Sequence, residues 1–360
     1  MTKKQAAKAT IFILLFLLIL QSITYIIRTN GDIKDIFTGF YAEKKDTLDV
    51  ILIGSSPVYT YYSAPQIWGE TGIACYPLSS NVQRPGAALP LIREAEKTQS
   101  PRVFVFEMRM YTMEDGDMSE NMAFARGVTD NMKYSANRIY AINRLVTTKE
   151  DRYTYYFDIF KYHSNWKTMV LPDQIRCVTY EKKNPLKGFV IRDHVALLSE
   201  PELDYRQITA TRPIPEEQEE RLRELLQVLK DNEQQALFIV SPYTAKEDEA
   251  EMFNYMQQIV EGEGYTFVNM NLHTDEIGLD YTTDFHDIGH ANLSGAMKCS
   301  TYLGHLLQEY DISDKRGEKD YESFDKAYQY FQNIQTDTMM KIQEKIETGD
   351  YADPYGEAEE

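Results

Sequence analysis

Two short motifs, far apart in the 360-residue chain, hold the side chains best suited to chemistry. One is Gly54-Ser55-Ser56 and the other is Asp287-Ile288-Gly289-His290. A nucleophilic serine needs a histidine as general base, and that histidine needs a carboxylate to fix its tautomer. Ser56, His290 and Asp287 could fill these roles. The reaction would then be attack of the serine on an acyl ester carbonyl.

Each motif also has a plainer explanation. Serine is a favoured helix N-cap, so Ser55 or Ser56 could merely cap a helix that opens with Pro57. An Asp-x-x-His pattern is weak alone, because six histidines among many acids will often produce one by chance. Position strengthens both motifs, since each follows a predicted strand.

A metal site is a further alternative for the second motif. His286 and His290 are four residues apart, as in the helix of zinc proteases, and Asp284 could be a third ligand. That helix requires glutamate after the first histidine, whereas this chain has Asp287, and Gly289 weakens a helix. We therefore expect no metal here.

The elements that would position these motifs are short apolar runs typical of strands buried on both faces. The five runs are Leu48–Ile53, Ile73–Leu78, Arg102–Phe106, Ala236–Val240 and Tyr265–Met270. Helical patterns separate them, including the stripe Leu222, Leu225, Leu226 and Leu229. This alternation predicts an α/β fold, a three-layer α/β/α arrangement around a parallel sheet. Ligands bind at the carboxyl ends of such strands, where both motifs would lie.

Two regions depart from this alternation. Residues 111–210 are predicted to form an insertion, helical over Met118–Val146 and dense in aromatic residues over Tyr153–Trp166. Those aromatics predict core filling, with a ligand platform as the alternative. Residues 311–360 predict a helix around Tyr328–Ile346 and a solvated acidic tail over Gly349–Glu360.

A membrane anchor is predicted at residues 9–27, where no charged residue occurs between Lys8 and Arg28. A cleaved signal peptide is the alternative, but Ser22–Arg28 is a poor cleavage site. Lys3, Lys4 and Lys8 precede the segment, so the positive-inside rule puts residues 1–8 in the cytoplasm. The rest of the single-pass protein would lie outside the cell, where soluble acyl donors are absent.

Composition excludes several classes of protein. Lys plus Arg is 38 and Asp plus Glu is 56, a net charge of −18 that argues against nucleic acid as partner. It also argues against electrostatic binding to an anionic bilayer. The hydrophobic content of 43% excludes a mostly disordered chain. Cys75, Cys177 and Cys299 form no CxxC, which argues against a zinc ribbon or disulfide scaffold and leaves at least one free thiol.

Taken together, Ile51–Ser56 and Asp287–His290 resemble the SGNH/GDSL hydrolase superfamily. The resemblance is to its membrane-anchored cell-envelope branch, which includes D-alanyl-transfer and alginate O-acetylation proteins and has Gly-Ser-Ser in place of Gly-Asp-Ser. It covers about residues 45–110 and 235–310 of the predicted 45–310 domain. The resemblance implies Ser56 as nucleophile, His290 as general base and Asp287 as its orienting acid, with Ser55 where the family has aspartate.

The chain departs from the family at the oxyanion hole. The family uses a glycine N–H after the second strand and an asparagine after the third. This chain has Ser79-Ser80-Asn81 and Glu107-Met108-Arg109 there, so Asn81 or Arg109 could serve instead. Ser55 is a third candidate for contact with the oxyanion or the substrate. Glu107 and Arg109 would share a face of the strand end and could form an ion pair.

The resemblance implies a serine esterase or O-acyltransferase acting on an envelope polymer such as a teichoic acid or polysaccharide. This chemistry needs no cofactor. An acyltransferase outside the cell would need a membrane-bound acyltransferase partner to deliver its acyl donor. The alternative is an inactive binding or assembly module for envelope polysaccharide machinery, consistent with the altered oxyanion positions.

Overall fold

The computed structural model describes residues 1–28, 31–116, 123–167 and 182–355. Its centre is a parallel five-stranded sheet of order β2-β1-β3-β4-β5. The strands are β1 Val50–Ile53, β2 Cys75–Pro77, β3 Val103–Glu107, β4 Gln235–Val240 and β5 Thr266–Asn269. All five predicted strands are confirmed, and the order is that of a doubly wound, flavodoxin-like sheet.

The sheet is buried on both faces because alternate side chains enter two separate hydrophobic clusters. Ile51, Phe104 and Phe238 point into one cluster, whereas Leu52 and Val105 point into the other. The core therefore has two halves with the sheet between them. This explains why the strands are continuous apolar runs rather than alternating ones.

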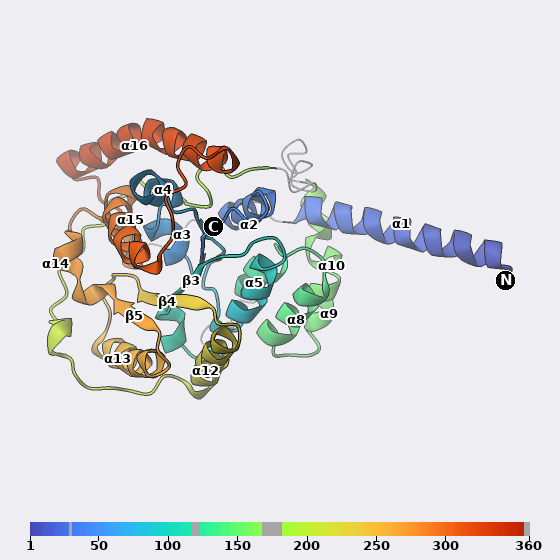
Figure 1. Cartoon of the computed structure of the whole chain (residues 1–360), viewed down its shortest axis with the longest axis horizontal. Helices are drawn as coiled ribbons and strands as arrows, with labels where there is room; N and C mark the ends of the chain where they lie inside the picture. Colours follow the sequence, from blue (N-terminus) through green and yellow to red (C-terminus); the bar gives the residue numbers. More distant parts are fainter. Residues whose placement is uncertain (29–30, 117–122, 168–181, 356–360) are drawn as a thin grey trace.

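Helices cover both faces (Figure 1). The first cluster is covered mainly by α2 Asp32–Ala42, α5 Ala88–Ala95, α12 Glu216–Asp231 and α13 Glu247–Gly262. The second is covered mainly by α3 Pro57–Tyr61, α4 Ala64–Thr71, α15 Leu293–Leu307 and α16 Glu322–Thr348. The predicted leucine stripe of α12 is buried, as expected for an amphipathic crossover helix.

The remaining elements are short. They are α14 Thr274–Ile277, the hairpin β6 Phe285–Asp287 and β7 His290–Ala291, and the 3-10 turns η1 Pro85–Ala87, η2 Arg109–Thr112, η4 Tyr205–Gln207, η5 Met270–Leu272, η6 Gln308–Tyr310 and η7 Lys319–Tyr321. The hairpin follows β5 in the chain and precedes α15.

The segment between β3 and β4 contains α7 Ala123–Thr129, α8 Ala136–Leu145, α9 Arg152–Tyr156, α10 Ile159–Tyr162 and η3 His163–Lys167. The helical stretch predicted over Met118–Val146 is thus broken between α7 and α8, and its first residues lie outside the described part. Core filling is wrong for most of the aromatic stretch. Tyr155 and Tyr162 are buried, but Tyr153, Phe157, Phe160 and Trp166 are exposed.

The N-terminal helix α1, Lys3–Ile27, projects away from the rest of the molecule (Figure 1). Within the described residues it is the one helix long and apolar enough to cross a membrane. Ile11 to Ile19 are exposed along it, whereas Thr24, Tyr25 and Ile27 are buried against the domain. Cys75 and Cys299 are buried free thiols, and Cys177 lies outside the described residues.

Candidate active site

Ser56 lies just beyond the carboxyl end of β1, at the first residue before α3. Gly54 makes this turn possible, because a Cβ there would lie 2.6 Å from Cβ of Glu107 and 2.7 Å from Cγ2 of Val58. The Ser56 side chain makes no capping hydrogen bond to α3. Capping therefore does not explain this serine, and its hydroxyl is available for another partner.

That partner is His290 on the β6–β7 hairpin. The distance from Ser56 Oγ to His290 Nε2 is 2.6 Å. On the other side of the imidazole, Nδ1 is 2.8 Å from both carboxylate oxygens of Asp287. Asp287 and His290 are paired across the hairpin, which explains their spacing of three residues. The structure thus brings the three predicted residues into one hydrogen-bonded chain from two distant motifs.

Asp287 is set up to remain a carboxylate. Burial alone would raise its pKa, but the hydrogen bond and charge of His290 lower it overall. The backbone N–H of Gly289 also donates to Asp287 Oδ1 at 2.7 Å. The side chains of His290 and Asp287 keep 28% and 26% of their surface exposed, so the site is open to solvent.

Arg109 braces the same hairpin from the end of β3. Its Nη2 donates to the carbonyl of Gly289 at 2.9 Å, and its Nε lies 3.6 Å from Oε1 of Glu107. The guanidinium also stacks over Tyr243, 4.5 Å from the ring centroid. The predicted pair of Glu107 and Arg109 is therefore present and buried.

Burial dominates the electrostatics of this pair. It raises the pKa of Glu107 despite the opposing charge of Arg109. For Arg109, burial would lower the pKa, but the Glu107 charge raises it overall. The Nη1 of Arg109 is buried and has no hydrogen-bond partner. This nitrogen is therefore a buried donor whose hydrogen bond is unmet among the described residues.

The other predicted oxyanion candidates differ in position. Asn81 is exposed, and its Oδ1 accepts a hydrogen bond from the Tyr59 hydroxyl. Ser55 is buried, 2% exposed, beneath the turn that carries Ser56. Of the three candidates, Arg109 is the one whose side chain hydrogen-bonds to the loop that holds His290.

The residues of the predicted metal alternative do not assemble. Asp284 forms an ion pair with Lys298 at 2.6 Å, and His286 stacks on His194 with ring centroids 5.0 Å apart. Among the described residues, no group of three or more His, Cys, Asp or Glu side chains could hold a metal ion. His286 and His290 also belong to two strands rather than to one helix.

Two supports of the hairpin were not predicted from the sequence. The segment after Val190 runs beside it, with Ala196 N–H donating to Phe285 O at 2.8 Å and Leu293 N–H to Arg192 O at 2.8 Å. The C-terminal segment, predicted to be a solvated tail, lies on the other side of that segment. Ala352 N–H donates to Val195 O at 2.8 Å, and Ile288 N–H donates to Pro354 O at 3.2 Å.

Residues 352–354 of the predicted solvated tail are thus held by backbone hydrogen bonds, while their side chains stay partly or fully exposed. No local pattern in the sequence signals either support, since the partners are far apart in the chain.

Neither family models nor curated proteins match this chain. The assignment of this candidate site therefore depends on the contacts observed in the structure.

Proposed function

We propose that this protein is a membrane-anchored serine esterase or O-acyltransferase of SGNH type, acting on acyl esters of a cell-envelope polymer. The observation that carries the proposal is the chain of hydrogen bonds from Ser56 through His290 to Asp287. The sheet order and the position of Ser56 after β1 support the SGNH assignment.

The proposed reaction has two steps. Ser56 Oγ attacks the acyl carbon while His290 Nε2 takes its proton, and a bond forms between Oγ and that carbon. The bond between the acyl carbon and the ester oxygen then breaks, and the leaving oxygen takes the proton from Nε2 to become a hydroxyl group. In the second step, water or a polymer hydroxyl attacks the acyl carbon and gives its proton to Nε2. The bond between Oγ and the acyl carbon then breaks, and Nε2 returns the proton to Oγ of Ser56. Asp287 holds the imidazole with Nε2 facing the serine.

Arg109 is proposed to stabilise the developing oxyanion in place of the asparagine of the family. Its unpartnered Nη1 and its position at the end of β3 support this role. A positioned donor of this kind contributes about 3–4 kcal/mol to lowering a barrier. The same guanidinium would keep the histidine loop in place through Gly289.

In the proposed topology, α1 spans the bilayer and the domain that follows it lies outside the cell. Lys3, Lys4 and Lys8 precede the apolar stretch. Arg28 follows it, but this arginine is buried in an ion pair with Asp158, which removes it from the flanking charges that face the membrane surface. A membrane-bound acyltransferase that supplies the acyl group remains part of this proposal.

A fluorophosphonate probe tests for an activated serine in the full-length protein. We expect the label on Ser56, located by peptide mass spectrometry, and no label in Ser56→Ala or His290→Ala. Ser100→Ala changes an exposed serine and is the matched control, which should label like the wild type. A folded wild-type protein that stays unlabelled would contradict the enzyme and favour a binding or assembly module.

A further inference from the structure

Five large apolar side chains on the segment between β3 and β4 stay exposed. Tyr153, Phe157, Phe160 and Trp166 are 57–64% exposed, and Ile139 is 51% exposed. We call these five residues the aromatic face. Tyr153 and Phe160 touch edge to face, and a hollow of about 550 Å³ lies between Ile139 and Phe157. Monomeric proteins rarely leave such a patch without a binding partner.

The helix α10, which carries Phe160, lies beside the base of α1 (Figure 1). Both α10 and η3, which carry Phe160 and Trp166, contact this helix. Asn165 Nδ2, next to Trp166, donates to Ile27 O at 3.1 Å. The last turn of α1 and the aromatic face are therefore neighbours in space.

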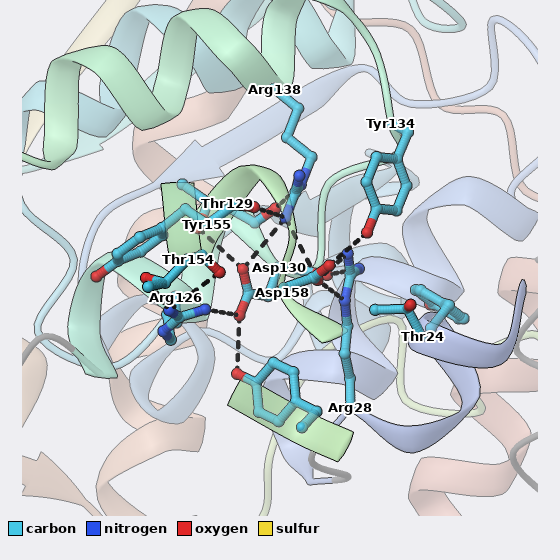
Figure 2. Close-up of polar contacts among 12 residues, drawn as sticks. Thr24, Arg28, Arg126, Thr129, Asp130, Tyr134, Arg138, Thr154, Tyr155 and Asp158 are labelled. Carbon is cyan, nitrogen blue, oxygen red and sulfur yellow. Dashed lines mark hydrogen bonds and ion pairs between the residues drawn. The ribbon is translucent and has the colours of Figure 1, made fainter. Parts of the chain in front are cut away.

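A buried ion cluster fixes the two together (Figure 2). Arg28, directly after α1, pairs with Asp158, which lies between Phe157 and Phe160 in the sequence. Arg138 joins the cluster, 3.4 Å from Asp158 and 3.3 Å from Asp130. Arg28 and Asp158 are only 2% and 1% exposed. The angle between α1 and the aromatic face is thus set by buried contacts rather than by a loose linker.

The length of α1 places the face at a definite depth. The uncharged stretch from Ala9 to Ile27 rises about 28 Å as a helix, no more than the roughly 30 Å of a bilayer's hydrocarbon core. The whole stretch is therefore needed to cross the hydrocarbon core. Yet Thr24, Tyr25 and Ile27 are buried by the domain. The parts of the domain that cover them must therefore reach the level of the outer headgroups.

We propose that the aromatic face rests in the interfacial layer of the bilayer beside α1, with phospholipid as its occupant. Aromatic side chains favour that layer because it solvates both apolar rings and polar edges. The catalytic domain then has two attachments to the membrane and a fixed orientation above it. This inference rests on the anchor proposed above and is independent of catalysis.

Fluorescence of Trp166 tests the proposal in the full-length protein reconstituted in phosphatidylcholine nanodiscs. The chain has two tryptophans, and Trp68 is fully buried, so subtracting the emission of Trp166→Phe isolates Trp166. With lipid brominated near the top of its acyl chains, we expect loss of most Trp166 emission and little quenching by iodide. Unchanged emission in brominated lipid together with strong iodide quenching would overturn the proposal.

Two reporters in the Trp166→Phe background separate this inference from the anchor. Leu15→Trp lies in the middle of α1 and should be quenched by lipid brominated deep in the chain. If that reporter is quenched and Trp166 is not, the anchor stands and the inference falls. If neither is quenched, both fall. Tyr330→Trp, exposed on α16, is the matched control and should respond to iodide alone.

Discussion

Ser56 differs from other helix-opening serines of this protein in what its side chain contacts. Ser63 and Ser135 each accept a backbone N–H from the helix they cap. Ser56 occupies the same kind of position, but its hydroxyl contacts His290 instead. A capping side chain satisfies a free helix N–H. In α3 the N–H groups of Val58 and Tyr59 donate instead to the carbonyls of Ser55 and Ser56, which leaves the Ser56 hydroxyl free to contact the imidazole. This contrast is the local observation that supports the proposed role of Ser56 as a nucleophile.

His286, four residues before the proposed base, makes stability depend on pH. Burial lowers its pKa to about 4, against an ordinary value of about 6.5. Between these values the unfolded chain binds the proton that the folded chain excludes. The contribution of His286 to the free energy of unfolding is therefore fully present above about pH 6.5 and is lost as the pH drops toward about 4.

We expect His286→Gln to flatten this decline in thermal unfolding of the detergent-solubilised protein. Arg192, His194, Asp287 and His290 all act on His286 and remain in the variant. His305→Gln changes an exposed histidine and controls for loss of one ionisable group. Parallel stability curves for wild type and His286→Gln would show that His286 is not held neutral.

At the scale of elements, β1 and β3 approach each other so closely that only glycine fits at position 54. Gly54→Ala would force Cβ against Glu107 and Val58, and we expect a loss of about 1–3 kcal/mol in unfolding free energy. It should also slow fluorophosphonate labelling, because the turn that carries Ser56 must shift. Gly262→Ala, where an added Cβ meets nothing within 4 Å, is the matched control. Equal stability of the two variants would refute the packing argument.

The C-terminal segment is expected to hold the catalytic hairpin through its backbone. Ending the chain after Gly349 removes the hydrogen bonds of Ala352 and Pro354 with Val195 and Ile288. We expect slower labelling of Ser56 with thermal unfolding of the core little changed. Deleting residues 356–360 leaves both bonds intact and is the control. Full labelling after the longer deletion would show that the segment does not support the site.

The sequence predicts the elements and motifs of this molecule better than the contacts between its distant segments. The five strands are predictable because each is an apolar run bounded by turn residues. Ser56 and the Asp287–His290 pair are predictable because each follows a strand. The contact between Ile288 and Pro354 is not, since backbone pairing leaves no pattern in side chains. Core filling is wrongly predicted for most of the aromatic stretch, because composition shows that residues are apolar but not which of them other parts of the chain cover.

At the scale of the whole molecule, the ion cluster at Arg28 joins α1 to the domain. Arg28→Met would leave Asp158 buried with one cation fewer, and breaking such a pair costs about 3–5 kcal/mol. We expect a lower thermal midpoint for the full-length protein in detergent, with Arg102→Met, an exposed arginine, unchanged. A midpoint equal to the wild type would mean that the cluster does not secure the helix.

In the proposed reaction, Ser56 forms an acyl-enzyme with the help of His290 and Asp287. The most direct measurement is mass spectrometry of the full-length protein after brief incubation with p-nitrophenyl acetate and an acid quench. We expect an acetyl group on the peptide that contains Ser56, absent in Ser56→Ala and strongly reduced in Asp287→Asn. Acetylation elsewhere, or equal acetylation of Ser56 in wild type and Asp287→Asn, would contradict it.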